Sequence, residues 1–475
     1  MTHTFPPPPW GAIPSPRQLA WHRLETYGFI HFTTNTFTDL EWGYGDESPQ
    51  VFNPTALDTR QWARVAKEGG LKGLILTCKH HDGFCLWPSK YTTHSVVNSP
   101  WQNGQGDVVR ELADACREFD LKMGIYLSPW DRNHSLYGQP AYVEYYRDQL
   151  VELLSLYGPI FEVWHDGANG GDGWYGGSCE TRKINPASYY GWLETWGLVR
   201  LLQPEAVIFC DAGGDIRWVG NEAGIGSETT WCTFNPAGRY PGYPEVSDMG
   251  TGHEGGSHWA PPETDVSIRP GWFYHSHEDE SVKSISQLVD IYFKSVGRGT
   301  SLLLNLPPDR RGLINEIDAS RVRVLHEVLE RTFEYDLAPG AMITASNTRG
   351  PDFAATRLVD SNPDTYWAAE DRVTSAQLIF EFKYPIVFNI FQAQEYIALG
   401  QRVRAWRLEA QTPDGNWLPV TEGTTIGNKR LARFAAVTTQ MVRFSMQDCA
   451  ACPVLSSISL FYNPDLSVVD SIQRS

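Results

Sequence analysis

Short apolar runs and amphipathic stretches alternate along the first two-thirds of the chain. Apolar runs of strand length lie at residues 28–33, 73–78, 122–127, 160–165, 206–210, 272–275 and 301–306, and amphipathic stretches lie between them at 58–68, 107–119, 142–156, 188–202 and 284–296. Strands that are apolar on both faces and alternate with helices indicate a parallel sheet. Seven or eight such units over about 330 residues favour a closed (β/α)8-like TIM barrel over an open sheet.

The character of the sequence changes near residue 335. Short segments with period-two alternation follow at 377–382, 406–410 and 441–445, with turns such as Pro413-Asp-Gly-Asn416 between them and no long helical pattern. These features predict an all-β sandwich. Because 475 residues exceed the usual size of one hydrophobic core, we expect two domains, a barrel at 1–334 and a sandwich at 335–475.

Net charge and hydropathy exclude several classes of partner. A net charge of −17 repels phosphate backbones and anionic membranes, so a neutral substrate is favoured over nucleic acid or a membrane surface. No apolar stretch approaches the roughly 18 to 20 residues of a membrane span. The proline-rich N-terminus lacks the pattern of a secretory signal, so we expect a cytoplasmic protein or a chain whose leader has been removed. No pattern predicts an oligomeric state.

Polar residues gather where the predicted strands end. The first strand leads to His31 and Asn35, the second to Lys79-His-His-Asp-Gly-Phe84, the third to Tyr126-Leu-Ser-Pro-Trp-Asp131, and the fourth to Trp164-His-Asp-Gly167. In a barrel of this kind the chemistry lies at the carboxyl ends of the strands. The sequence therefore predicts an active site at this edge.

Asp166 is the first candidate for a catalytic group. In a strand over 160–166, alternation places Glu162, Trp164 and Asp166 on one face and His165 on the other. If the first face points into the barrel, Asp166 lies at its mouth, where a carboxylate can attack an anomeric carbon and form a covalent ester. The alternative is an Asp-Gly turn that only ends the strand.

A glycosidase also needs a second carboxyl group, which protonates the leaving oxygen and in a retaining enzyme lies about 5 Å from the first. The candidates after the fifth strand are Asp211, Asp215, Glu222 and Glu228. Glu222 follows a glycine-rich loop that can fold over a substrate, whereas Asp215 could pair with Arg217.

The doublet His80-His81 has three competing interpretations. Adjacent strand residues point in opposite directions, so both histidines reach one site only if the chain leaves the sheet there. They could contact sugar hydroxyls, bind a metal together with His31 and Asp166, or include one buried structural histidine. The second interpretation describes a metal-dependent hydrolase.

Seven motifs follow one another in an order that resembles the α-L-fucosidases of glycoside hydrolase family 29. They are His31-Phe-Thr-Thr-Asn-Thr-Phe37, Glu41-Trp-Gly43, Lys79-His-His-Asp-Gly-Phe84, Gly124-Ile-Tyr-Leu-Ser128, Trp164-His-Asp-Gly167, Trp218-Val-Gly-Asn-Glu222 and Leu303-Leu-Asn-Leu-Pro-Pro308. The Gly-Asn-Glu form is similar to the branch that prefers α-1,3- and α-1,4-linked fucose.

The resemblance implies a retaining exo-α-L-fucosidase that acts on a fucosylated glycan without a catalytic metal or cofactor. It implies Asp166 as nucleophile and Glu222 as acid/base, and it assigns contacts with the sugar to His31, Glu41, Trp42, His80, His81, Tyr126, Trp164, Trp218 and Trp272. Histidine donors and aromatic walls suit a sugar with an axial hydroxyl and a methyl group. One departure is His165, where the family usually has Phe; strand parity predicts that it faces the helices.

The last third resembles the discoidin-like, galactose-binding-like jelly roll of many carbohydrate-binding modules, on the segment Ala355-Thr-Arg-Leu-Val-Asp-Ser-Asn-Pro-Asp-Thr-Tyr-Trp367. Such a domain either binds glycan or buttresses the barrel. The resemblance implies a structural Ca²⁺ held through Asp360 or Asp364. A glycan-binding protein without catalysis is the remaining alternative for the whole chain.

Overall fold

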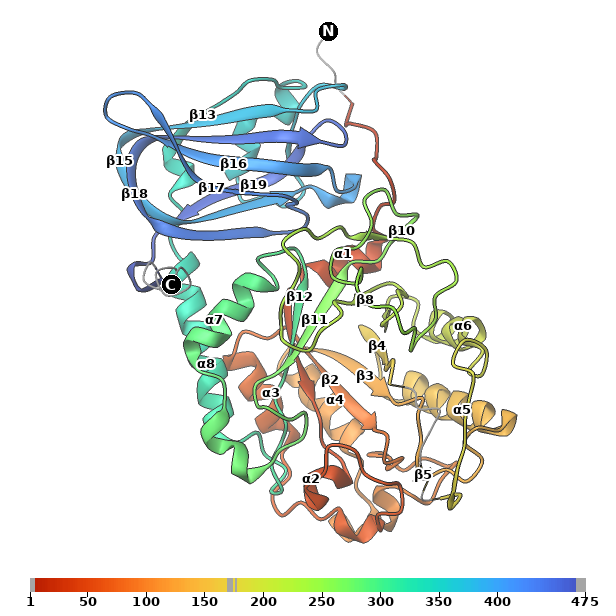
Figure 1. Cartoon of the computed structure of the whole chain (residues 1–475). Helices are drawn as coiled ribbons and strands as arrows, with labels where there is room; N and C mark the ends of the chain where they lie inside the picture. The colour runs from red at the N-terminus through yellow and green to blue at the C-terminus, as the bar shows by residue number, and fades with distance from the viewer. Residues whose placement is uncertain (1–4, 169–173, 176, 467–475) are drawn as a thin grey trace.

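The computed structural model describes residues 5–168, 174–175 and 177–466. It shows a barrel followed by a β-sandwich, with the sandwich drawn in blue beside the end of the barrel in Figure 1. The fold class expected from the sequence is therefore confirmed.

Eight strands form the barrel, and every pair of neighbours that shares a ladder is parallel. Their order in the sheet is β7-β4-β3-β2-β1-β12-β11-β8. A parallel bridge between Phe209 and Ile216 joins the two edges, so the barrel is nearly closed. The strands are β1 (Thr26–Ile30), β2 (Gly73–Lys79), β3 (Lys122–Leu127), β4 (Glu162–His165), β7 (Val207–Cys210), β8 (Arg217–Trp218), β11 (Pro262–Ser267) and β12 (Ser301–Asn305).

Helices surround the barrel (Figure 1), and several of them begin at capping side chains. The carboxylates of Asp58 and Asp107 accept a backbone N–H of the first turn, and Ser284 forms a capping box with Gln287. The helices are α1 (Pro16–His22), α2 (Thr34–Thr38), α3 (Thr59–Glu68), α4 (Val108–Glu118), α5 (Pro140–Leu156), α6 (Trp192–Leu202), α7 (Ile285–Lys294) and α8 (Glu316–Phe333). Two short ribbons, β5 (Trp174–Tyr175) with β6 (Glu180–Thr181) and β9 (Thr233–Phe234) with β10 (His258–Trp259), lie in the connections.

The sandwich is built around two strands of 20 residues, which lie at the centre of one folded seven-stranded sheet. Residues 376–382 of β15 pair with β13 and with the second half of β18, which continues to β16 and β17. Residues 390–395 of β15 pair with β19, and β14 adds to its edge. The strands are β13 (Ala341–Ala345), β14 (Trp367–Ala368), β15 (Ala376–Glu395), β16 (Val403–Gln411), β17 (Trp417–Gly423), β18 (Arg430–Cys449) and β19 (Val454–Phe461).

The expected strand at 272–275 is wrong, because these residues form bends and loop. The seventh barrel strand is β11, whose sequence Pro-Glu-Thr-Asp-Val-Ser is too polar to read as an apolar run. Its acidic residues Glu263 and Asp265 are buried nonetheless. The two-residue strand β8 was also not predicted.

Polar contacts join the two domains. Glu228 of the barrel pairs with Arg430, Glu25 pairs with Lys429, and Asp290 pairs with Arg433. The N-terminal segment crosses the sandwich before entering α1, since Trp10 donates its backbone N–H to the carbonyl of Leu399 (Figure 1). Within the described ranges, no helix combines the length and the apolar character that crossing a membrane requires.

Candidate active site

A cavity of about 310 Å³ opens at the carboxyl ends of the barrel strands. Phe29, Tyr126 and Trp164, which belong to the aromatic core inside the barrel, lie in its wall. The lining residues are Phe29, His31, Glu41, Trp42, His80, His81, Tyr126, Trp164, Asp166, Ala168, Glu222, Asp265 and Trp272. They come from many strand ends and loops, as expected for a barrel enzyme.

Asp166 follows β4 directly, and its side chain is 19% exposed. Its Oδ2 accepts a hydrogen bond of 2.7 Å from the Tyr126 hydroxyl and lies 3.6 Å from Nε2 of His81. Its Oδ1 accepts the backbone N–H of Ala168 over 2.7 Å. The hydrogen bonds from Tyr126 and Ala168 fix the orientation of this carboxylate at the cavity wall.

Burial raises the pKa of Asp166 to about 6, and the nearby charge of Glu222 adds to this rise. The hydrogen bonds from Tyr126 and Ala168 act in the opposite direction because they stabilise the carboxylate. Asp166 is therefore ionised near neutral pH but is less strongly solvated than a surface aspartate.

Glu222 is the one member of the four candidate second carboxylates that lines the cavity. It is exposed, and its Oε2 accepts the indole N–H of Trp272 over 3.1 Å. Asp215 is buried between Arg17 and Arg200, and Glu228 pairs with Arg298 and Arg430 at the domain interface. Both have structural partners that account for them.

Asp211, the fourth candidate, lies behind Asp166. A side chain at Gly167 would collide with its carboxylate, which accepts the backbone N–H of Gly242 over 2.8 Å. Burial raises the pKa of Asp211 to about 7. Asp211 is not part of the cavity wall in the described structure, and the charge of Asp166 adds to the rise of its pKa.

Glu41 connects the cavity to the loop that carries Trp272. Its two oxygens accept the backbone N–H groups of Trp272 and Phe273 over 2.8 and 3.1 Å. His275 bridges Glu41 and Asp39, with 2.7 Å from each ring nitrogen to a carboxylate oxygen. Both ring nitrogens face carboxylate oxygens, so this arrangement favours the doubly protonated, cationic form of His275.

The hydrogen bonds of His31 and His81 determine which ring nitrogen is protonated. The amide nitrogen of Asn305 donates to the carbonyl of Trp272, so its oxygen faces His31 Nδ1, which donates over 2.9 Å. The hydroxyl of Ser128 donates to the carbonyl of Trp130, so it accepts from His81 Nδ1 over 2.7 Å.

The same two rings therefore present an unprotonated Nε2. Burial lowers the pKa of each to about 3, so both stay neutral at physiological pH. In each neutral ring Nδ1 is already used as the donor, so Nε2 is left as a hydrogen-bond acceptor on a residue that lines the cavity.

His80 and His81 both line the cavity because β2 ends at Lys79 and the chain leaves the sheet there. The ring of His80 stacks on Tyr126 with 5.7 Å between centroids. Across the described ranges, the one group of three His or acidic side chains with potential ligand atoms within 4.8 Å of one another is Asp39, His275 and His277. That group does not include His31, His80, His81 or Asp166.

Ten of the eleven residues expected at the site line the cavity, and Trp218 does not. Its indole N–H donates to Oδ1 of Asp265 over 2.8 Å, so it supports a wall residue. Phe29, Ala168 and Asp265 were missed. Glu263 and Asp265 alternate with other residues on β11, and both are buried. This alternation of acidic residues is the sequence pattern that could have indicated Asp265.

His165 faces the helices, as strand parity predicts. It is fully buried, its Nδ1 lies 3.0 Å from the Tyr146 hydroxyl of α5, and its ring packs against Trp192 of α6. Asp360 and Asp364 of the sandwich are already engaged. Asp360 accepts bonds from Thr365 and Asn362, and Asp364 lies 3.4 Å from Arg23.

Comparison with known proteins identifies the family. Residues 10–332 match the family model described as alpha-L-fucosidase, and residues 342–456 match the F5/8 type C domain. The chain is 43% identical over 456 residues to "Alpha-L-fucosidase 1" of Arabidopsis thaliana, covering 94% of this chain and 87% of the relative.

Two solved structures share the whole fold. A putative alpha-L-fucosidase of Bacteroides thetaiotaomicron superposes with a TM-score of 0.90 at 41% identity, over 96% of this chain and 99% of the other. A Ruminococcus gnavus GH29 fucosidase in complex with fucose gives 0.89 at 29% identity, over 98% of both chains. These matches support neither the metal-dependent hydrolase nor the non-catalytic glycan-binding protein. The chain belongs to the α-L-fucosidases of glycoside hydrolase family 29, with a C-terminal F5/8 type C domain.

Proposed function

We propose that this enzyme releases terminal α-1,3- or α-1,4-linked L-fucose from glycans with retention of configuration, by a double displacement. The observation that carries the proposal is the pair Asp166 and Glu222 on the wall of one cavity. The first is buried and held by two donors, whereas the second is exposed at the mouth. The two carboxyl groups have the environments that different roles require.

In the first step, Asp166 attacks the anomeric carbon of fucose while protonated Glu222 donates its proton to the leaving glycosidic oxygen. The bond between sugar and aglycone breaks as an ester between the sugar and Asp166 forms. The hydrogen bond from Tyr126 keeps the Asp166 carboxylate ionised and oriented.

In the second step, Glu222, now a carboxylate, removes a proton from water, and the water oxygen attacks the anomeric carbon of the ester. L-Fucose leaves with its original anomeric configuration and Asp166 is restored. The acceptors His31 and His81, the wall residue Glu41 and the aromatic walls of Trp42, Trp164 and Trp272 suit the hydroxyls and the apolar face of the sugar.

Azide distinguishes the two roles. Asp166→Ala should lose roughly four orders of magnitude in kcat because the covalent step is gone, and azide should restore turnover with β-L-fucosyl azide as product after one inversion. Glu222→Ala should retain activity on an activated aryl fucoside and yield α-L-fucosyl azide after two inversions. Glu194→Ala, an exposed glutamate on α6, is the matched control and should behave as wild type. Absence of azide products from both variants would exclude the two-carboxylate mechanism.

The preference for α-1,3 and α-1,4 linkages rests on the Gly220-Asn221-Glu222 form of the acid/base loop. Product release should be compared for α-1,2-, α-1,3-, α-1,4- and α-1,6-fucosylated oligosaccharides and an aryl fucoside. We expect kcat/KM to be highest for the α-1,3- and α-1,4-fucosylated oligosaccharides. Equal values of kcat/KM for all four linkages would contradict the proposal.

Catalysis is proposed to need no metal or other cofactor, and the structural Ca²⁺ in the sandwich remains a prediction. EDTA should leave kcat unchanged. If Ca²⁺ binds through Asp360 or Asp364, EDTA lowers the melting temperature of the wild type but not that of Asp360→Asn combined with Asp364→Asn. Groups of the protein already contact both carboxylates. If EDTA leaves the melting temperature of the wild type unchanged, the prediction of a structural Ca²⁺ is wrong.

A further inference from the structure

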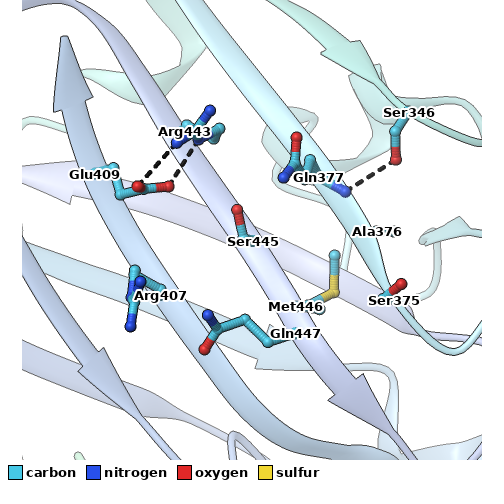
Figure 2. Close-up of a pocket in the computed structure, with 10 residues that line it drawn as sticks. All are labelled: Ser346, Ser375, Ala376, Gln377, Arg407, Glu409, Arg443, Ser445, Met446 and Gln447. Carbon is cyan, nitrogen blue, oxygen red and sulfur yellow. Dashed lines mark hydrogen bonds and ion pairs between the residues drawn. The ribbon is translucent and has the colours of Figure 1, made fainter. Parts of the chain in front are cut away.

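Polar side chains also gather outside the catalytic cavity. One group lines a hollow on the sandwich, where Arg443 donates to both oxygens of Glu409 over 2.7 and 2.8 Å (Figure 2). The charges of that pair are satisfied within the protein. Another group consists of Asp39, His275 and His277, which lie in the connections after β1 and β11. Imidazole nitrogens and carboxylate oxygens are the ligands that a zinc ion takes.

The three side chains of this second group converge from distant parts of the chain. Asp39 follows α2 directly, and His277 lies in the 3-10 turn Ser276–Ser281. Each of the three offers one ligand atom, and these atoms lie within 4.8 Å of one another. A zinc ion with bonds of about 2.0–2.1 Å places neighbouring ligand atoms roughly 3.3 Å apart. Asp39 and His277 are exposed, so rotation of their side chains can close the remaining distance.

The buried member of the group, His275, is held by a carboxylate on its far side. Its Nε2 lies 2.7 Å from Oε1 of Glu41, which also accepts the backbone N–H groups of Trp272 and Phe273. A histidine that binds zinc usually donates its other ring N–H to a carboxylate, which sets the orientation of the ring. With Nε2 bonded to Glu41, Nδ1 is the nitrogen that faces Asp39, at 2.7 Å from its Oδ1. Glu41 therefore stands where the outer partner of a zinc ligand is expected.

Solvent reaches the group through Asp39. Its side chain is 50% exposed, and it borders a hollow of about 270 Å³ together with Ser276 and Arg310. Water from this side can fill the fourth position of a tetrahedral ion. The positive charge of Arg310 also acts on Asp39 and opposes the charge of an ion. We therefore expect a moderate affinity and not the very tight binding of an enclosed metal site.

We propose that Asp39, His275 and His277 form a zinc-binding site. The ion binds a carboxylate oxygen of Asp39, Nδ1 of His275, a ring nitrogen of His277 and a water molecule. It displaces the proton from Nδ1 of His275 into the solvent, while the proton on Nε2 stays in the hydrogen bond with Glu41. Two imidazoles and one carboxylate suit Zn²⁺, whereas Ca²⁺ and Mg²⁺ take oxygen ligands.

The site is structural and takes no part in the displacement at the sugar. Its three ligands lie outside the wall of the catalytic cavity that the described residues form. Zinc ties Asp39 at the end of α2 to the segment 275–277, and through Glu41 it reinforces the loop that carries Trp272. An ion that binds the folded chain alone stabilises it, so zinc raises the melting temperature.

Calorimetry on the full chain, freed of metal by a chelator, tests the proposal with ZnCl₂ as titrant at pH 7.5. We expect one ion per chain with a micromolar Kd, and saturating zinc should raise the melting temperature by a few degrees. His277→Gln removes an exposed ligand, so it should weaken binding at least tenfold and abolish this rise. Asp39→Asn should do the same. An excess of CaCl₂ should leave the Kd for zinc unchanged.

His258→Gln, at an exposed histidine of β10, is the matched control and should bind zinc as the wild type does. His277→Gln should hydrolyse an aryl fucoside at the wild-type rate in the absence of zinc, because its side chain is outside the cavity. If His277→Gln lowers the melting temperature of the metal-free enzyme, Asp39→Asn decides.

The position of the ion is the second readout. In crystals grown with zinc, the anomalous peak should lie between the three proposed ligands. The proposal is overturned if zinc does not bind even at millimolar concentration, if the two ligand variants bind like the control, or if Ca²⁺ displaces zinc. It is also overturned if the anomalous peak lies on His31, His80 or His81 of the catalytic cavity.

Discussion

The indole N–H of Trp272 donates to Oε2 of Glu222 over 3.1 Å, while the backbone N–H of the same residue donates to Glu41 over 2.8 Å. Trp272 therefore links the proposed acid/base to Glu41, another residue of the cavity wall. Glu222 is exposed and lies on a loop, and this hydrogen bond holds its carboxyl group at the cavity wall.

Trp272→Phe keeps the aromatic wall and removes the indole donor. Loss of one hydrogen bond to a charged group costs about 1.5–3 kcal/mol, so kcat/KM on a fucosylated oligosaccharide should fall roughly 10- to 100-fold. An activated aryl fucoside needs little protonation and should lose much less. Trp10→Phe, at a partly exposed tryptophan of the N-terminal segment, serves as control. Equal losses on both substrates would show that Trp272 acts only as a wall.

Tyr126→Phe should move the acid limb of the pH profile. The Tyr126 hydrogen bond lowers the pKa of Asp166, which burial raises to about 6. Without it the pKa rises further, and the nucleophilic carboxylate forms only at higher pH. The acid limb of kcat/KM should therefore lie near pH 6 in the wild type and shift upward in the variant. Tyr384→Phe, at an exposed tyrosine of the sandwich, should leave it in place.

Asp166→Asn should be inactive but more stable at neutral pH. The folded-state pKa of Asp166 is raised, so the fold holds a proton that the unfolded chain releases. Stability is therefore lost as pH rises from about 4 to about 6, and the loss is complete above that range. A rise of about two units corresponds to about 2–3 kcal/mol.

The melting temperature of Asp166→Asn should thus exceed that of the wild type at pH 7.5, and the difference should vanish below about pH 4. Asp352→Asn, at an exposed aspartate of the sandwich, should show no such pH-dependent difference. A variant that is equally stable or less stable at pH 7.5 would contradict the conclusion that burial raises the pKa of Asp166.

Most of the barrel could be predicted from the sequence, because the patterns of apolar strands and capped amphipathic helices depend on residues close together in the chain. The helices that begin after Asp58 and Asp107 start within one residue of their predicted positions. The strand β11 was missed because it does not look apolar. The barrel interior can bury its acidic residues because they find hydrogen-bond partners there. There Glu263 accepts the indole N–H of Trp164 over 2.8 Å, and such partners are 99 residues apart in the chain.

The sequence predicted those residues of the site whose positions follow from the ends of the barrel strands. Asp166 and Tyr126 lie where strand geometry places them, and parity predicted the outward His165. Trp218 was placed in the cavity because its motif adjoins Glu222, but its side chain turns to Asp265 instead. The bridge from Asp39 through His275 to Glu41 joins residues 234 or more positions apart, and no local pattern contains that information.

His275→Gln should remove a pH dependence of stability. Burial lowers the pKa of His275, but the hydrogen bonds and charges of Asp39 and Glu41 outweigh it and raise the pKa above its ordinary value. Stability from the charged bridge is therefore fully present below about pH 6.5 and is lost as pH rises through the raised folded pKa. Since the carboxylates are partly exposed, the contribution is about 1 kcal/mol after screening.

The groups that face His275 are Asp39, Glu41, His277 and the backbone of the 271–273 loop, and Arg310 lies near Asp39. Between pH 6 and 9 the wild type should lose a few degrees of melting temperature more than His275→Gln does. The KM for fucosides should rise in the variant because Glu41 then holds the Trp272 loop less firmly. His258→Gln, at an exposed histidine of β10, is the control, and a variant with the wild-type slope would show that His275 is neutral in the fold.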